Sequence, residues 1–187
     1  RKMLHLFFVL LLSVMCAEPH RPMISEKFEM KASITVQDLT SKKNWIGEGE
    51  WRVDQPAGNS TMHFEFGGAE HMNIFDIVRY DLGKVYSVND TAAHATCTAT
   101  TLPTKHMPAL WSWVATASYN GTVDMEHTTY DKWVSTGSTS EVKAILVRQD
   151  APNYLAGYLS ADAKEEVFVW VHDFRIPKHI DDAWFDV

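Results

Sequence analysis

The sequence is poor in cysteine and in basic residues. Its two cysteines, Cys16 and Cys97, among 187 residues exclude a disulfide-dense miniprotein and a multi-cysteine zinc module. The chain has 17 Lys and Arg but 24 Asp and Glu. Its formal charge of −7 argues against nucleic acid and anionic membranes as main partners. Because 45% of the residues are hydrophobic, a collagen or a disordered chain is also excluded. The length suits one globular domain.

Catalytic and metal-binding motifs are also missing. The chain has no G-x-S-x-G elbow, no glycine-rich phosphate loop and no H-E-x-x-H, and its nine histidines are scattered. Cys97 lies in Thr96-Cys97-Thr98, which carries no protease signature. We therefore expect no catalytic residue and no resident metal, and we expect that the protein is not an enzyme. Calcium is the one cofactor kept as an alternative, because Asp181, Asp182 and Asp186 lie close together, although without an EF-hand pattern.

The N-terminus has the three regions of a secretory signal peptide. Arg1 and Lys2 precede an apolar stretch, and small residues follow near Cys16 and Ala17. The stretch is shorter than the roughly 20 residues that a membrane-spanning helix needs. We predict that residues 1–17 are a signal peptide, that residues 18–187 form a single β-rich domain, and that the protein is secreted or lysosomal.

Export has two consequences for single residues. Cleavage leaves Cys97 as the one cysteine of residues 18–187, so we expect a disulfide partner beyond Val187 and a domain truncated at its C-terminus. Three Asn-x-Ser/Thr sequons lie in turn-like sequence, and we predict glycosylation at Asn59, Asn89 and Asn120.

Alternating apolar and polar residues predict strands along most of the chain. In residues 28–36, every second residue is apolar, which is typical of a strand with one buried face. Similar patterns predict strands at 45–54, 62–66, 72–80, 84–88, 142–148, 154–159 and 167–174. Short strands at this spacing indicate an antiparallel sheet, as a sandwich or an open barrel. The one predicted helix covers residues 107–118, where Leu110, Trp111 and Val114 would share a face.

Large aromatic side chains suggest an apolar binding site. In the last predicted strand, Val167, Val169 and Val171 alternate with Phe168 and Trp170, and Phe174 is expected beside the latter pair, so both faces are apolar. Such a strand lies in the centre of a packed core or lines a hydrophobic cavity, and both alternatives remain open. We predict one ligand-binding face that contains Met30, Ile34, Trp51, Phe64, Phe66, Phe168 and Trp170.

Several short motifs occur in an order that resembles the ependymin-related proteins. They are Phe75-Asp76-Ile77-Val78-Arg79-Tyr80, the turn Asp81-Leu82-Gly83, then Cys97 and Leu102, and later Tyr119-Asn120-Gly121, Trp133, Gly137, Pro152, Gly157 and the closing residues 174–187. The resemblance covers about two-thirds of the chain. Ependymins commonly carry about four half-cystines, whereas this chain keeps one after export. A similar layout occurs in the non-catalytic N-terminal domain of some papain-like cysteine proteases.

The resemblance implies a LolA-like fold, in which a strongly curved antiparallel sheet or open half-barrel, with one or two short helices, holds a hydrophobic pocket. It also implies an extracellular glycoprotein that binds lipid and calcium. The working hypothesis is a non-enzymatic protein that binds a lipid or other hydrophobic small molecule, with no nucleic-acid partner and no transmembrane segment, and with a homodimer as an alternative assembly. The competing hypotheses are an accessory domain of a papain-like protease and a calcium-dependent matrix or adhesion protein.

Overall fold

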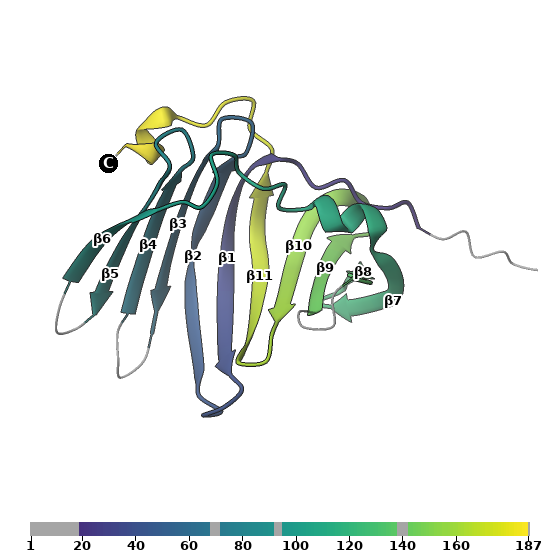
Figure 1. Ribbon diagram of the computed structural model, residues 1–187. Helices are drawn as coiled ribbons and strands as arrows, with labels where there is room; N and C mark the ends of the chain where they lie inside the picture. The colour runs from purple at the N-terminus through teal and green to yellow at the C-terminus, as the bar shows by residue number, and fades with distance from the viewer. Residues whose placement is uncertain (1–18, 68–71, 92–94, 138–141, 187) are drawn as a thin grey trace, which may run out of the picture.

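A computed structural model describes residues 19–67, 72–91, 95–137 and 142–186; the predicted signal peptide, with Cys16, lies outside these ranges. The described residues form one antiparallel sheet of eleven strands (Figure 1). The strands are β1 (Lys27–Asp38), β2 (Asn44–Asp54), β3 (Asn59–Phe66), β4 (Met72–Arg79), β5 (Lys84–Thr91), β6 (Ala95–Thr101), β7 (Ser118–Met125), β8 (Thr128–Val134), β9 (Val142–Arg148), β10 (Ala151–Ala161) and β11 (Glu165–Arg175).

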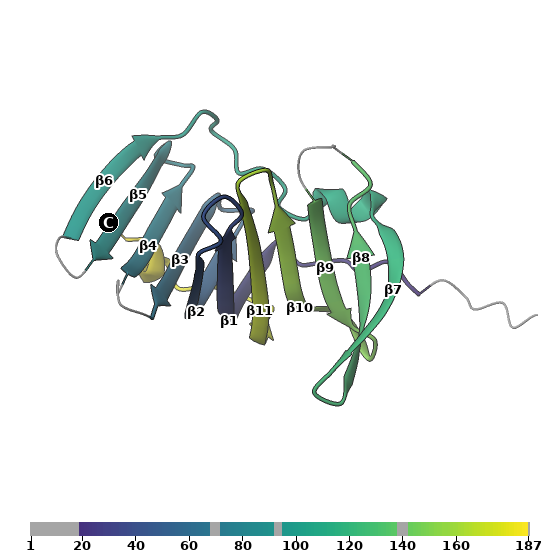
Figure 2. The same cartoon turned by 90° about the horizontal axis from the view of Figure 1, so that it is seen from below.

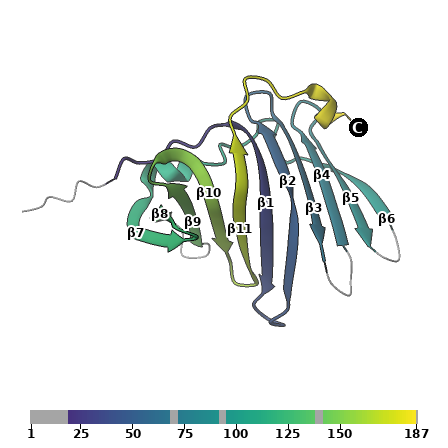
Figure 3. The same cartoon turned by 180° about the vertical axis from the view of Figure 1, so that it is seen from behind.

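Two meanders build the sheet, whose order is β6-β5-β4-β3-β2-β1-β11-β10-β9-β8-β7. After β6, the chain crosses to the opposite edge, starts again at β7 and returns until β11 pairs with β1. Figures 1 and 3 show an open, curved sheet whose two edge strands, β6 and β7, do not meet. The prediction of a mainly β, curved antiparallel fold is therefore confirmed.

The predicted helix at residues 107–118 is wrong. Within the described residues, helical structure is limited to two 3-10 turns, η1 (Ser112–Thr116) and η2 (Asp182–Phe185). Ala117 is already extended, with φ −62° and ψ 150°, and β7 begins at the next residue. The segment that joins β6 to β7 has to cross most of the sheet, and a mainly extended chain covers this distance with fewer residues than a helix.

Three strands are absent from the sequence-based prediction. All of β6 is exposed, because it is an edge strand without an apolar face, and its Ala-Thr run shows no hydrophobic alternation. The strands β7 and β8 form a hairpin whose regular alternation is interrupted by a register shift between Tyr119 and Thr122. A pattern of period two is lost in both situations.

The register defines two faces of the sheet. On β1, Phe28, Met30 and Ala32 lie on the face that we call the inner face; Met30, for example, is opposite Trp51 on β2 and Phe174 on β11. The main hydrophobic core lies on this face. Its buried members are Ile24, Phe28, Met30, Ala32, Val53, Phe64, Phe66, Val114, Ala117, Trp133, Ile145, Val147, Leu155, Val169, Val171 and Phe174.

A β-bulge on β11 returns Phe174 to the inner face. Lys31 pairs with Asp173 whereas Ala32 pairs with Val171, so His172 is an extra residue on β11. Phe174 consequently lies on the same side as Val171, and its ring stacks on Phe28 at 5.5 Å between centroids. The expectation that Phe174 shares a face with Phe168 and Trp170 is therefore wrong, because sequence alternation alone does not reveal a bulge.

Two segments cover opposite faces of the sheet (Figure 2). The crossing segment with η1 lies on the inner face, where Trp111 contacts Phe28. The C-terminal segment with η2 lies on the outer face beside β3 and β4. There the guanidinium of Arg52 lies 3.6 Å from the ring of Trp184, and Arg79 Nη1 donates to the carbonyl of Phe185 at 2.7 Å.

Glycine is required at position 49, where β2 passes close to the backbone of β3. A Cβ on Gly49 would lie 1.9 Å from the carbonyl oxygen of His63, which is backbone and cannot rotate away. We expect Gly49→Ala to lower the free energy of unfolding by about 2 kcal/mol or more, measured by urea denaturation. Gly67→Ala is the control, because a Cβ there meets nothing within 4 Å, and its effect should stay within about 0.5 kcal/mol. Equal stabilities of wild type and Gly49→Ala would contradict this account.

The anchoring of the C-terminal segment depends on Arg79. Its guanidinium forms a fork with Asp81 and also donates to Phe185. We expect Arg79→Met to lower the free energy of unfolding by about 1–3 kcal/mol and to accelerate trypsin cleavage at exposed Lys178. Arg148→Met is the matched control, because Arg148 makes the same fork with Asp150 on an exposed strand end. Unchanged cleavage in Arg79→Met would refute this anchoring role.

The same fork gives a pH dependence. Its hydrogen bond from Arg79 lowers the pKa of the Asp81 carboxyl below the ordinary value. The stabilisation is complete above the ordinary carboxyl pKa and is lost as the pH falls through the folded value. Denaturation measured between about pH 5 and pH 2 should therefore show a smaller loss of stability with acid in Arg79→Met than in wild type.

Candidate functional site

An apolar groove lies on the inner face across the five strands from β11 to β4. Its volume is about 320 Å³. Its lining residues are Ile34, Val36, Trp45, Met62, Phe64, Phe66, Met72, Ile74, Glu165 and Val167. Nine of these ten are apolar, and Glu165 is the one charged residue. Phe64 and Phe66 are buried, whereas the other apolar side chains are half-buried and so remain accessible to solvent.

Small residues form the floor of this groove. Gly47 lies between Ile34 and Phe66 in the register, and Gly49 lies between Ala32 and Phe64. A Cβ on Gly47 would come within 3.0 Å of the Phe66 ring, so the rings of β3 occupy space that side chains of β2 leave empty. Large residues on β3 beside small residues on β2 thus give the inner face its concave shape.

Aromatic rings close one end of the groove. Trp111 of the crossing segment lies 6.5 Å from Trp51, 6.2 Å from Phe28 and 5.6 Å from Tyr158, all between ring centroids. The ring of Trp51 also meets Phe28 edge-to-face at 5.3 Å. This group packs the centre of the inner face, so the solvent-accessible groove lies on the side of it toward the β1–β2 hairpin.

A second cavity, of about 510 Å³, lies between the N-terminal segment and the crossing segment. Its lining includes two charged residues, Arg21 and Glu26, and other residues from both segments. The Arg21 guanidinium donates to the carbonyl of Ala115 and lies 5.7 Å from the Trp133 ring. Arg21 therefore ties these two segments together, and the first groove is the more apolar of the two.

The structure brings five of the seven predicted ligand-binding residues to one face. Met30, Ile34, Trp51, Phe64 and Phe66 lie on the inner face. Ile34, Phe64 and Phe66 line the groove, whereas Met30 is buried beside it and Trp51 belongs to the aromatic group that closes its end.

Phe168 and Trp170 lie on the outer face, so the prediction that they share the ligand-binding face is wrong. They alternate on β11 with Val167 and Val169, which lie on the inner face. The two rings stack at 6.3 Å, and Trp170 also meets Tyr130 edge-to-face at 5.3 Å. Trp170 and Tyr130, together with Leu146 and Ala156, belong to a small second cluster that packs the outer face of the sheet.

The groove includes apolar residues that the sequence-based site did not contain. They are Val36, Trp45, Met62, Met72, Ile74 and Val167. Met62 and Val36 continue the same alternation that identified Phe64 and Ile34, so the sequence pattern could have assigned these two residues to the same face. Which strands are neighbours, and therefore which alternating residues meet, depends on the sheet order and not on the local pattern.

The remaining predicted residues lie away from the groove. Cys97 is exposed on edge strand β6, opposite Val88, as a free cysteine, and a partner beyond Val187 stays a prediction. Asn120 is exposed on β7, and Asn59 is half-buried at the start of β3; the side chain of Asn89 lies outside the described residues.

In the described part of the chain, no group of three His, Cys, Asp or Glu could hold a metal ion. Asp181 accepts a hydrogen bond from the amide of Ala183 and so caps η2.

The carboxyl groups with lowered pKa values belong to turns and strand ends. Backbone amides of Ser41 and Thr40 lower the pKa of Asp38, and those of Glu165 and Lys164 lower the pKa of Asp162. A hydrogen bond from Arg148 lowers the pKa of Asp150 in the same way. These three carboxylates hold turns in place, and none of them lines the groove.

Among the residues that the structure describes, no helix has the length and hydrophobicity that a membrane span requires.

Comparison with known proteins yields distant structural similarities only. No family model matches the chain, and no curated protein sequence matches it. Of solved structures, an uncharacterized conserved protein from Thermus thermophilus shares 10% identity, with 87% of this chain and 86% of that chain covered and a TM-score of 0.48. A DUF1329 family protein from Desulfovibrio piger shares 8% identity, with coverages of 87% and 90% and a TM-score of 0.37.

The lipoprotein LppX of Mycobacterium tuberculosis also shares 8% identity, with 81% of this chain and 90% of that chain covered and a TM-score of 0.38. All three TM-scores are low, at 0.48, 0.37 and 0.38, so these likenesses carry no functional argument. The chain is a mainly β protein with an open, curved antiparallel sheet, and its resemblance to the ependymin-related proteins rests on the quoted sequence motifs. Function has to be inferred from the groove.

Proposed function

We propose that this protein binds the hydrocarbon chain of a lipid or similar hydrophobic molecule in the inner-face groove, as a secreted or lysosomal glycoprotein that does not turn its ligand over. The observation that carries the proposal is the groove itself, a concave surface of nine apolar residues beside Glu165. Its volume of about 320 Å³ is within the range of small-molecule sites. Secretion and the absence of catalysis rest on the sequence features described above.

The groove differs from an ordinary protein core in its access to solvent. Ile34, Val36, Trp45, Met72 and Ile74 are only half-buried although they are adjacent and apolar. A contiguous apolar surface of this kind usually marks a binding site. Each methylene group that moves from water into it contributes about 0.8 kcal/mol, so an alkyl chain supplies binding energy without any specific polar contact.

A neutral alkyl probe tests the proposal. We expect decan-1-ol to bind the protein with a stoichiometry of one, and to bind about tenfold more tightly than octan-1-ol because it buries two further methylene groups. Tryptophan fluorescence, to which Trp45 in the groove contributes, and native mass spectrometry would measure both. Failure of both alcohols to bind the delipidated protein would refute the proposed function.

A pair of substitutions locates the site. Val36→Asp places a carboxylate in the groove and should weaken decan-1-ol binding at least about tenfold, because the alkyl chain would then have to cover a charge. Ile46→Asp makes the same kind of change on the neighbouring strand, at a side chain that is 63% exposed and does not line the groove. Equal effects of the two substitutions would place the bound alcohol elsewhere.

Glycosylation is a separate element of the proposal. The Asn120 side chain is exposed beside Gly121, whose φ of +80° forms a turn-like interruption of β7. The Asn59 amide, in contrast, is half-buried and lies 3.0 Å from the carbonyl of Gly58 and 3.3 Å from Asp81 Oδ1. In protein secreted from eukaryotic cells, we expect Asn120→Gln to remove one glycan, seen as a smaller mass, and Asn59→Gln to leave the mass of the glycans unchanged. A glycan lost in Asn59→Gln would contradict this difference.

A further inference from the structure

The inner face changes from apolar to polar along one row of cross-strand neighbours. In this row, Trp51 on β2 is opposite Met62 on β3, Met62 is opposite Asp76 on β4, and Asp76 is opposite Ser87 on β5. Thr98 on β6 completes the row beside Ser87. Directly opposite residues of antiparallel strands lie on the same face. An apolar groove thus borders a polar strip within a single face.

Asp76 is the carboxylate at this border. It is half-buried and lies two residues from Ile74 on the same face of β4. Ile74 lines the groove, and so does Met62, which is opposite Asp76 on β3. Within the described chain, Asp76 has neither a hydrogen-bond nor an ion-pair partner, whereas buried Asp54 pairs with Lys27 and buried Asp131 accepts from Gln149 at 2.8 Å. A half-buried carboxylate without a partner is suited to an external donor.

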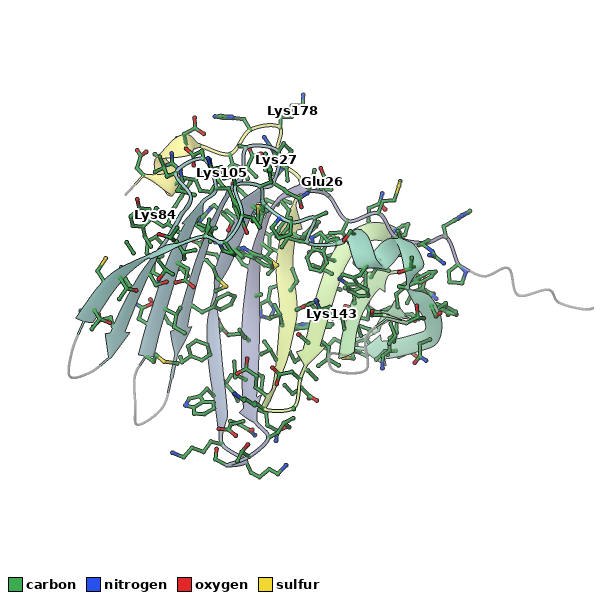
Figure 4. All side chains as sticks on the ribbon, viewed as in Figure 1. Glu26, Lys27, Lys84, Lys105, Lys143 and Lys178 are labelled. Carbon is green, nitrogen blue, oxygen red and sulfur yellow. The ribbon has the colours of Figure 1, made fainter. Side chains whose placement is uncertain are left out.

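The charged residues at the β4 end of the groove have one sign. Asp76 borders it at β4, and Glu165 lines it at β11. The lysines and arginines of strands β1–β6 and β11 lie on the outer face by their register: Lys27, Lys31, Arg52, Arg79, Lys84 and Arg175. Figure 4 shows the labelled Lys27, Lys84, Lys105 and Lys178 at the end of the sheet opposite the β1–β2 hairpin. Within the described residues, the one inner-face lysine of the neighbouring strands, Lys143 on β9, lies two strands beyond Val167, at the far end of the groove from Asp76. An anionic head group at Asp76 would therefore meet a carboxylate without a lysine or arginine on the same face of β1–β6.

The geometry points to an amphiphile with a single alkyl chain and a protonated amine head, and we propose that Asp76 determines this head-group specificity. The inference rests on the proposed function of the groove. The head lies at Asp76, with the hydroxyl of Ser87 beside it, and the chain extends over β3, β2 and β1 toward Val167 on β11. Across the sheet this path covers four strand spacings, about 19 Å, and it also shifts by six residues along the strands, from the row of Met30 to the row of Val36. Fatty-acid anions are disfavoured because their carboxylate would approach Asp76.

Three probes with the same chain and different heads test the specificity: decylamine, decan-1-ol and decanoate, each at about pH 7 and below its micelle concentration. For wild type, we expect decylamine to bind about fivefold or more tightly than decan-1-ol, and decanoate to bind most weakly, since a half-exposed ion pair contributes modestly. Asp76→Asn keeps the shape of the side chain and should remove most of the preference for decylamine. Raising the salt concentration should reduce the preference in wild type.

Two variants serve as controls. Glu65→Gln removes the same charge from β3 but on the outer face, opposite Asn73, and should leave the ratio of decylamine to decan-1-ol affinities unchanged. Glu165→Gln removes the carboxylate at the other end of the groove and tests whether the head lies there instead. If Asp76→Asn binds decan-1-ol with the same affinity as wild type, the variant retains its fold and its groove.

The outcomes separate the two proposals. If none of the three probes binds wild type, the proposed function is refuted and this inference with it. If decan-1-ol binds but decanoate binds as tightly as decylamine, only the head-group inference is refuted. A preference for decylamine that survives Asp76→Asn, or that Glu165→Gln abolishes, also overturns the assignment to Asp76.

Discussion

The pairing of β1 with β11 holds the two halves of the sheet together. Ten residue pairs join these strands, from Glu29 and Arg175 to Asp38 and Glu165, so the first and last strands of the described domain become central neighbours. The inner faces of both meanders meet at this line, where Phe28 stacks on Phe174. Because the contact joins residues far apart in sequence, the central core can form only after both meanders are available.

The curvature of the sheet and the crossing segment decide which apolar residues remain accessible. The crossing segment brings Trp111 and Val114 over Phe28, Trp51 and their neighbours and covers that part of the inner face. The rows closer to the β1–β2 hairpin receive no comparable cover from the described residues, and these rows form the groove. A single segment therefore separates one continuous apolar surface into a buried core and an open groove.

Aromatic residues occur in the core, in the groove and on the outer face, and the amino-acid composition alone does not tell which residue has which place. Trp133 is 1% exposed in the core, Trp51 and Trp111 close the end of the groove, and Trp45 lines it. Trp184 lies on the outer face against Arg52. Within the described chain, the indole N–H groups of Trp111 and Trp133 have no acceptor. Contacts of their rings therefore have to support their burial, since an unpaired donor opposes it.

Local sequence patterns predicted what depends on alternation and failed where distant neighbours decide. The alternation in β1 and β3 correctly placed Phe28, Met30, Phe64 and Phe66 on one face, because a strand with one buried side has period two. The bulge at His172, the extended crossing segment and the exposed edge strand β6 have no such signature. The position of Phe168 could not be resolved from the sequence either, because a strand with two apolar faces fits either assignment.

The same limit explains why Asp76 had no assigned role in the sequence. On its own strand it is one acidic residue between Phe75 and Ile77, and its surroundings come entirely from other strands. Only the sheet order sets it between Met62 and Ser87, at the line where the inner face changes from apolar to polar. An isolated carboxylate at that line matters because low solvent access strengthens its interaction with any charge that enters the groove. Specificity in such a groove therefore depends less on its apolar lining, which accepts any alkyl chain, than on the sign of the few charges at its border.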